Sequence, residues 1–221
     1  MGIAKKLLQL VVTVILVTLF ASFLLELLPG DPVEVLVPFG SPEQRTLVRE
    51  ETGLDQPFIV RYGQWLGGFV QGDLGNYYTV SSSNPVADRV ADAMPPTILL
   101  MVYAQVLALL IAIPVGVLAA YKQGTWFDRL SNTSAFAMLA IPTFALGFVL
   151  QYYVGVKLGW ADTGGFTSIG EDPAGHVRSM ILPTITLAVG QVAVYMRLLR
   201  SDMIATLQQD FITMAKAKGI T

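Results

Sequence analysis

Four long apolar stretches limit this chain to a membrane fold. The first covers residues 7–28, where only five side chains are polar or charged. As a helix it would extend roughly 33 Å, which is enough to cross the hydrocarbon core of a bilayer. Three more spans are predicted at residues 97–121, 134–156 and 180–199. The predicted fold class is therefore all-α: a polytopic membrane protein with four transmembrane helices and a small helical region outside the membrane.

The composition supports a membrane protein and excludes several kinds of site. Hydrophobic residues make up 53% of the 221 residues and charged residues 14%, whereas soluble domains average about 25% charged residues. With no cysteine and one histidine, the chain can build neither a disulfide framework nor a thiolate or multi-histidine metal site. It contains no phosphate-binding Gly-x-x-x-x-Gly-Lys-Ser/Thr motif, no His-Glu-x-x-His motif and no nucleophile elbow. We therefore predict no catalytic residue, no metal and no cofactor, and the net charge of −2 predicts no nucleic-acid partner.

The first apolar stretch has an alternative interpretation as a secretory signal peptide. Such a segment uses only roughly 7–15 apolar residues and is followed by a small-x-small cleavage site, which is missing here. We therefore favour a transmembrane helix. Glu26 lies within a turn of its exit, where a carboxylate can reach the lipid headgroups, so we interpret it as a solvated anchor rather than a substrate site.

Residues 29–96 are predicted to lie outside the membrane and to contain short helices. Leu-Pro-Gly-Asp-Pro at residues 28–32 ends the first span with two prolines and a glycine. Ser-Pro-Glu-Gln at residues 41–44 has the pattern of a capping box with proline at the first helical position. Gly53 is a natural end for the helix that starts there.

Two further helices are predicted in this outer region. Asp-Gln-Pro at residues 55–57 opens the first of them, which carries aromatic and apolar side chains at helical spacing: Phe58, Tyr62, Trp65, Leu66 and Phe69. This stripe predicts a helix that lies on the membrane surface or packs against the transmembrane bundle. The second begins at Asn84-Pro85 and is expected to end at Pro95 and Pro96.

The later spans contain prolines and glutamines that could matter for function. Each of the three spans is interrupted by one proline: Pro114, Pro142 and Pro183. Each also carries one glutamine, and these are the candidate translocation-path residues: Gln105, Gln151 and Gln191. Buried glutamines equally form hydrogen bonds between helices, so both interpretations stay open.

The distribution of charge predicts the orientation in the membrane. With four spans, one side receives the N-terminus, residues 122–133 and everything after residue 199, and the sequence assigns eight basic and three acidic side chains to it. The other side has longer loops with six basic and twelve acidic side chains. The positive-inside rule places the first side, including the N-terminus, in the cytoplasm.

The last stretch, residues 210–221, has the pattern of one short isolated helix. Asp210 can cap its start and Gly219 can end it. The small residues Ala215, Ala217 and Gly219 would allow another protein surface to come close. The charge count places this helix on the cytoplasmic side.

These landmarks resemble the B-type permease subunit of the dipeptide/oligopeptide/nickel ABC importers. The resemblance runs nearly from end to end and rests on motifs in a shared order: Leu-Pro-Gly-Asp-Pro at 28–32, Gly-Leu-Asp-Gln-Pro at 53–57, Tyr-x-x-Trp-Leu at 62–66, Gly-Asp-Leu-Gly at 72–75, Pro-Val at 85–86, Pro-x-Thr at 95–97, Ile-Pro at 141–142 and Gln-Asp-Phe…Ala-Lys-Ala-Lys-Gly at 209–219. The last motif is similar to the cytoplasmic EAA loop that docks into the ATPase subunit. Thr213 and Met214 replace its Glu-Ala, as in the peptide-importer branch.

The resemblance implies the type I ABC importer permease fold and a mechanical function. Four segments follow from it: the N-terminus and first span (1–28), an extracytoplasmic helical region (29–96), three spans of the permease core (97–199) and an incomplete ATPase-docking segment (200–221). The implied docking residues are Asp210, Phe211, Thr213, Ala215, Ala217 and Gly219. Members of the family continue past this glycine into two further spans, so the resemblance implies an N-terminal fragment of a longer permease.

The resemblance also implies partners, a location and a cargo. The partners are a second permease subunit in a heterodimer, two ATP-binding subunits, an extracytoplasmic substrate-binding protein and membrane lipid. The location is the cytoplasmic, or inner, membrane as a multi-pass protein. The cargo is a dipeptide or oligopeptide, which ATP-driven movement of the spans carries inward. This chain is then a transport subunit and not itself an enzyme.

Three alternatives remain at this point. A nickel or other small-solute importer of the same family is the nearest, because the binding protein largely sets specificity in these systems. An ATPase-independent channel or secondary transporter would usually place ionisable groups at mid-membrane, and the spans offer none. A membrane scaffold that binds partners through residues 29–94 is the third.

Overall fold

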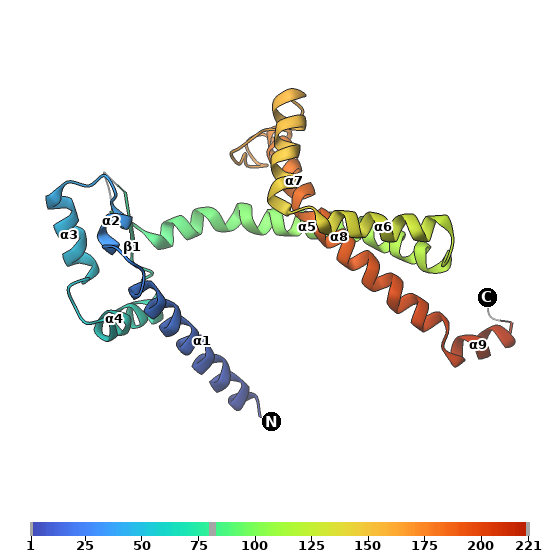
Figure 1. The fold of residues 1–221 in the computed structure, drawn as a ribbon, viewed down its shortest axis with the longest axis horizontal. Coiled ribbons are helices and arrows are strands. Elements are labelled where there is room, and N and C mark those ends of the chain that lie inside the picture. The colour runs from blue at the N-terminus through green and yellow to red at the C-terminus, as the bar shows by residue number, and fades with distance from the viewer. Residues whose placement is uncertain (1, 80–82, 220–221) are drawn as a thin grey trace. The chain divides into compact units, whose positions relative to one another are not determined.

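The computed structural model describes residues 2–79 and 83–219 in two compact units, Met1–Ala93 and Met94–Thr221 (Figure 1). Both units are built mainly of helices. Within the described residues, the strands are one short antiparallel pair, β1 (Asn76–Tyr78) and β2 (Ser83–Pro85). The predicted all-α membrane fold is confirmed, with this pair as a small addition.

Among the described residues, three helices are long and apolar enough to cross a membrane: α1 (Ile3–Glu26), α5 (Val86–Tyr121) and α8 (Pro173–Leu207). A fourth candidate is a bent pair that consists of α6 (Trp126–Ala140) and the segment Thr143–Lys157. That segment contains α7 (Thr143–Leu150) and a π-helix, η1 (Gln151–Lys157). The four predicted spans therefore correspond to three continuous helices and one broken one.

The first unit has its own small core outside the α1 helix. Its helices are α2 (Pro32–Leu36), α3 (Pro42–Thr52) and α4 (Phe58–Val70). The capping box predicted for α3 is present, and the helix ends at Gly53, which has a left-handed φ of 61°. The buried residues that hold α2 and α3 together are Val33, Val37 and Val48. An ion pair between Arg49 and Asp31 links the two helices at their surface.

The aromatic stripe of α4 packs against α1. The Tyr62 hydroxyl donates a hydrogen bond to the Ile15 carbonyl at 3.1 Å and lies 2.9 Å from the Thr18 hydroxyl. The Phe23 and Phe58 rings meet edge to face with centroids 5.8 Å apart. Of the two placements predicted for this stripe, the structure supports packing against a transmembrane helix.

The predicted span at residues 134–156 is present but broken at Pro142, the proline predicted to interrupt it. The chain bends by 92° between α6 and the segment that begins with α7, as Figure 1 shows. The cause lies at Ile141 and Pro142: a residue before proline is pushed out of the helical region, and Ile141 has an extended ψ of 118°. Residues 134–156 are therefore not one straight rod.

The predicted helix end at Pro95 and Pro96 is wrong. Helix α5 runs through both prolines, and through Pro114, without a break, as α8 does through Pro183. A proline ring holds φ near the helical value, and its main cost is a lost amide donor to the carbonyl one turn earlier. In a long membrane helix that cost is tolerated where other groups satisfy the carbonyl.

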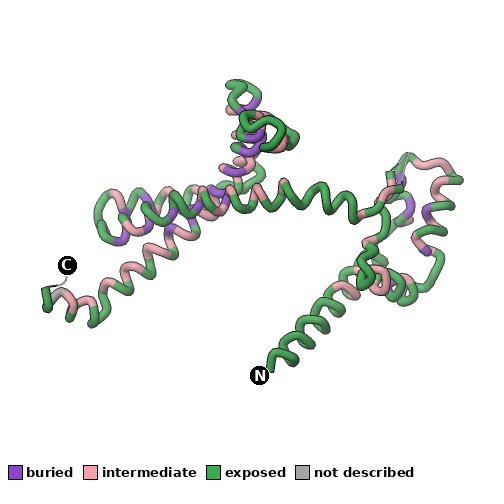
Figure 2. Tube along the Cα trace, turned by 180° about the vertical axis from the view of Figure 1, so that it is seen from behind, coloured by how far each residue is buried: buried purple, intermediate pink, exposed green. Residues whose placement is uncertain are grey.

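The second unit packs around a row of small residues on α5. Ala104, Ala108, Ala112, Gly116 and Ala120 recur every four residues and are all buried (Figure 2). Ala108 and Ala112 of this row pack with buried residues of α6 and α8: Ala135, Ala188, Val192, Ala193 and Met196. Small residues at this spacing allow helix backbones to approach closely in a membrane, where packing rather than hydrophobicity drives association.

Candidate functional site

The candidate docking helix is present as α9 (Asp210–Ala217), and its boundaries refine the prediction. The carbonyl of Gln209 accepts the amide of Thr213 at 3.3 Å, which makes Gln209 the capping position. The prediction that Asp210 caps the helix is therefore wrong; it is the first helical residue, where its charge still complements the helix dipole. Gly219 has a φ of +80° just past the helix, as predicted for a glycine that ends it.

Helix α9 presents large apolar side chains to its surroundings. Phe211 is 58% exposed and Met214, one turn later, is 60% exposed. Thr213 and Ala217 are exposed and Ala215 is half-buried. Ile220 and Thr221, the last residues of the predicted docking stretch, lie outside the described residues. An exposed apolar pair at this spacing forms one face that a partner groove could take up.

A charged junction lies near the α9 end of α8. Arg200 on α8 donates through Nε and through Nη2, at 2.8 Å, to the carboxylate of Asp128 in the first turn of α6. Asp128 is only 4% exposed. Its carboxylate also accepts the amide of Gly124, at 2.9 Å, from the turn between α5 and α6. Sequence reasoning missed this pair, because its members lie 72 residues apart.

The three candidate path glutamines are not gathered at one place. Gln105 accepts a hydrogen bond from the Tyr195 hydroxyl at 3.1 Å, which links α5 to α8 and matches the structural interpretation of this residue. Gln191 is half-buried, and within residues 2–79 and 83–219 its buried side-chain oxygen has no hydrogen-bond partner. Gln191 lies one turn before Tyr195 on α8, and so on the same side of that helix.

Gln151, in contrast, lines a cavity of about 490 Å³. This cavity lies between α7, η1 and α8 and the loop before α8, and Gln105 and Gln191 do not line it. The Gln151 side chain donates to the carbonyl of Thr163, which holds that loop against η1. The absence of a side chain at Gly155 allows this loop to lie against η1, because a Cβ at that position would lie 2.6 Å from the Thr163 side chain.

His176, the single histidine of the chain, is a structural residue that the sequence analysis did not identify. It is 2% exposed near the start of α8. Its Nδ1 lies 2.7 Å from the carbonyl of Thr167, and its Nε2 lies 3.1 Å from the Tyr103 hydroxyl of α5. A carbonyl can only accept, so Nδ1 carries the proton and, in the neutral ring, Nε2 accepts from Tyr103. His176 thus joins α5, α8 and the loop between η1 and α8.

We expect His176→Ala to destabilise this unit by about 1–3 kcal/mol, because two buried partners lose their hydrogen bonds. The expected result is a lower midpoint in thermal unfolding of the purified protein in detergent. Val177→Ala is the matched control, since Val177 is exposed and adjacent. Equal midpoints for the two variants would contradict a structural role for His176.

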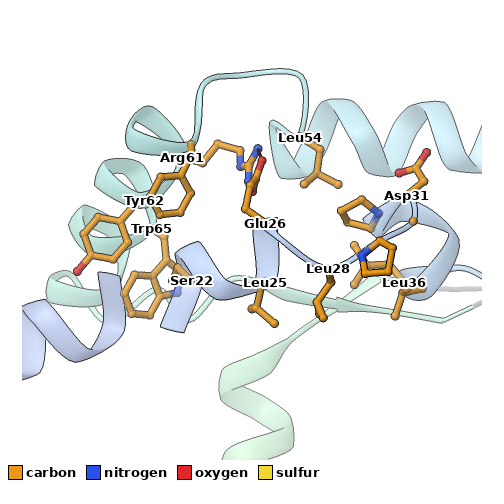
Figure 3. Close-up of a pocket in the computed structure, with 15 residues that line it drawn as sticks. Ser22, Leu25, Glu26, Leu28, Asp31, Leu36, Leu54, Arg61, Tyr62 and Trp65 are labelled. Carbon is orange, nitrogen blue, oxygen red and sulfur yellow. Dashed lines mark hydrogen bonds and ion pairs between the residues drawn. The ribbon is translucent and has the colours of Figure 1, made fainter. Parts of the chain in front are cut away.

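The first unit contains a cavity of its own, of about 380 Å³. Figure 3 shows Glu26 and Arg61 pointing toward one another at its edge, and the two form an ion pair. The remaining lining is mainly apolar and comes from α1, α2 and α4. Glu26 is therefore a side chain paired with Arg61 at the end of α1.

Comparison with known proteins identifies the family. Residues 112–221 match the family described as "Binding-protein-dependent transport system inner membrane component", and residues 2–101 match the corresponding N-terminal family. A Brucella abortus (strain 2308) protein named as a peptide transport system permease is 35% identical over 220 residues, which is 99% of this chain and 69% of the relative. Glutathione transport system permease protein GsiC of Escherichia coli (strain K12) is 34% identical with the same coverage. The chain belongs to the family of binding-protein-dependent transport system inner membrane components, the multi-pass permeases of ABC importers.

Proposed function

We propose that this chain is the permease subunit of an ATP-driven importer that carries dipeptides or oligopeptides across the cytoplasmic membrane. The names of the relatives, which refer to peptide and glutathione transport, support this cargo. The observation that carries the proposal is α9, a short helix that directly follows the last long helix and exposes Phe211 and Met214. Such a helix is suited to insertion into a groove on a partner.

The proposed arrangement places α9 and the N-terminus in the cytoplasm. The positive-inside rule supports it, because the shorter loops on that side carry eight basic side chains against six on the other. On this view two ATP-binding subunits dock through α9, and a second permease completes a heterodimer. A substrate-binding protein delivers the peptide from outside. The chain hydrolyses no ATP itself and depends on these ATP-binding subunits.

The proposed mechanism is movement of packed helices driven from α9. Closure of the ATPases pushes α9, and α8, which is continuous from Pro173 to Leu207, transmits the push across the membrane. The spans then rock between inward-open and outward-open arrangements. Asp210, Thr213, Ala215, Ala217 and Gly219 join Phe211 as the proposed docking residues. Of the candidate path residues, Gln191 is the best supported because its oxygen lacks a partner within the described part of the chain.

The cargo can be tested by competition. Proteoliposomes that contain the complete gene product with its partner subunits and binding protein are expected to accumulate a radiolabelled dipeptide when ATP is supplied. Unlabelled dipeptide should reduce this uptake and Ni²⁺ should not. Competition by Ni²⁺ alone, with no effect of dipeptide, would instead assign the importer to nickel.

A further inference from the structure

The Asp128–Arg200 junction has features beyond those of an ordinary ion pair. The Asp128 carboxylate receives two guanidinium donors of Arg200, the Gly124 amide and, at 3.4 Å, the side-chain amide of Asn132. All four donors converge on a group that is almost completely buried. A two-point contact between a guanidinium and a carboxylate fixes direction as well as distance.

The junction joins the turn after α5 and the start of α6 to the C-terminal part of α8. Gly124 lies in the turn after α5, with a left-handed φ of 79°, Asp128 lies in α6 and Arg200 lies in α8. A second contact also joins α8 to α6: the Arg197 guanidinium lies 4.2 Å from the centre of the Phe136 ring. The C-terminal part of α8 is thereby held to α6 and to the turn after α5, two helical turns before α8 ends.

The junction lies at the point along α8 where a movement of α9 would reach the other spans. Helix α8 continues from Arg200 to Leu207, and α9 begins at Asp210. A displacement of α9 therefore reaches the spans through the last two turns of α8. The two-point ion pair fixes the direction of α8 relative to α6, so its loss would let those turns bend or rotate separately.

We propose that Asp128 and Arg200 are positioning residues that couple movement of α9 to α5, α6 and α8 as one body. This proposal rests on the proposed function of the chain as an ATP-driven permease. The Asp128–Arg200 pair is needed for coupling ATP hydrolysis to transport, and not for docking of the ATPase or for assembly of the complex.

The test uses Asp128→Asn and Arg200→Gln in the complete complex reconstituted with its ATP-binding subunits and binding protein. Three quantities are measured: co-purification of the ATP-binding subunits, ATP hydrolysis, and uptake of radiolabelled dipeptide. Asp128→Asn leaves the half-buried Arg200 charge without its partner, and Arg200→Gln leaves the buried Asp128 charge without its partner. Peptide moved per ATP hydrolysed is therefore expected to fall roughly tenfold, with co-purification unchanged. Arg200→Lys keeps the charge but loses the two-point geometry, so it should give an intermediate ratio.

Matched controls remove the same charges from exposed neighbours. Arg129→Gln and Asp202→Asn lie one and two residues from the pair, at exposed positions, and should keep the wild-type ratio of peptide to ATP. If Asp128→Asn or Arg200→Gln does not assemble, the ratio is measured in Arg200→Lys and Asp128→Glu, which keep both charges.

Two results would overturn the proposal. One is an unchanged ratio of peptide to ATP in the variants that assemble, including Arg200→Lys and Asp128→Glu. The other is a parallel loss of co-purification, hydrolysis and uptake that extends to the charge-keeping variants Arg200→Lys and Asp128→Glu, which would make the junction purely structural. Failure of the wild-type complex to bind ATP-binding subunits or to move peptide would instead refute the proposed function, so the two failures can be told apart.

Discussion

Replacing Gly116 with leucine is expected to prevent α5 and α8 from packing and to remove most of the folded permease. A Cβ at Gly116 would already lie 3.0 Å from the Met196 carbonyl and 3.4 Å from Leu199 side-chain atoms. The remaining atoms of a leucine would have to displace the α8 backbone. We expect a loss of about 3 kcal/mol, since added bulk in a packed helix interface forces backbone shifts. Size-exclusion chromatography and thermal unfolding in detergent measure this loss.

Gly190→Leu is the matched control for that substitution. Gly190 lies on α8, and a Cβ there meets no atom within 4 Å among the described residues. We expect this variant to elute and unfold like the wild-type protein. A Gly116→Leu variant that is as stable as Gly190→Leu would show that α5 and α8 do not approach each other as closely as the structure has them.

Replacing Ala215 with tryptophan is expected to remove ATPase docking without unfolding the membrane part. Ala215 lies in the middle of α9, among the small residues proposed to let the partner surface approach. A bulky ring there holds the two surfaces apart and weakens the contacts of Phe211 and Met214. A loss of tenfold or more in binding, equivalent to about 1.4 kcal/mol, is expected. Co-purification of the ATP-binding subunits with the tagged permease measures it.

Ala205→Trp provides the control for the docking prediction. Ala205 is an exposed alanine in the last turns of α8, close to α9 in sequence but outside it. This variant should retain the ATP-binding subunits at the wild-type level. Equal retention by Ala205→Trp and Ala215→Trp would remove the docking role from α9.

Much of the fold could be predicted because the relevant signals are local. The capping box of α3 and the glycine that ends it lie within one short stretch, and the structure has both. The apolar length of α1 needs no partner to be recognised. The family could be predicted from short motifs in a fixed order. A relative that is 35% identical over 99% of this chain confirms that family.

Proline was the least reliable signal along the chain. Pro142 does break its span, through the effect of its ring on Ile141, whereas Pro95, Pro96 and Pro114 lie inside a continuous α5. Which of these happens depends on whether neighbouring groups satisfy the carbonyls that a proline leaves without a donor. That is a tertiary property, so residue type alone could not distinguish the cases.

The site was predictable where it is local and not where it is assembled from distant segments. Helix α9 and the left-handed Gly219 were visible in sequence, but the Asp128–Arg200 junction and the His176 contacts join residues 72 and 73 positions apart. One signal was available and unused: small residues at every fourth position from Ala104 to Ala120 indicate a helix face that packs closely.

In the proposed mechanism a partner ATPase drives peptide import through α9. The most direct measurement is accumulation of a radiolabelled dipeptide in proteoliposomes that contain the complete complex, with and without ATP, for the wild-type protein and Ala215→Trp. We expect ATP-dependent accumulation by the wild type and none by Ala215→Trp. Accumulation that is independent of ATP, or equal in the two proteins, would contradict it.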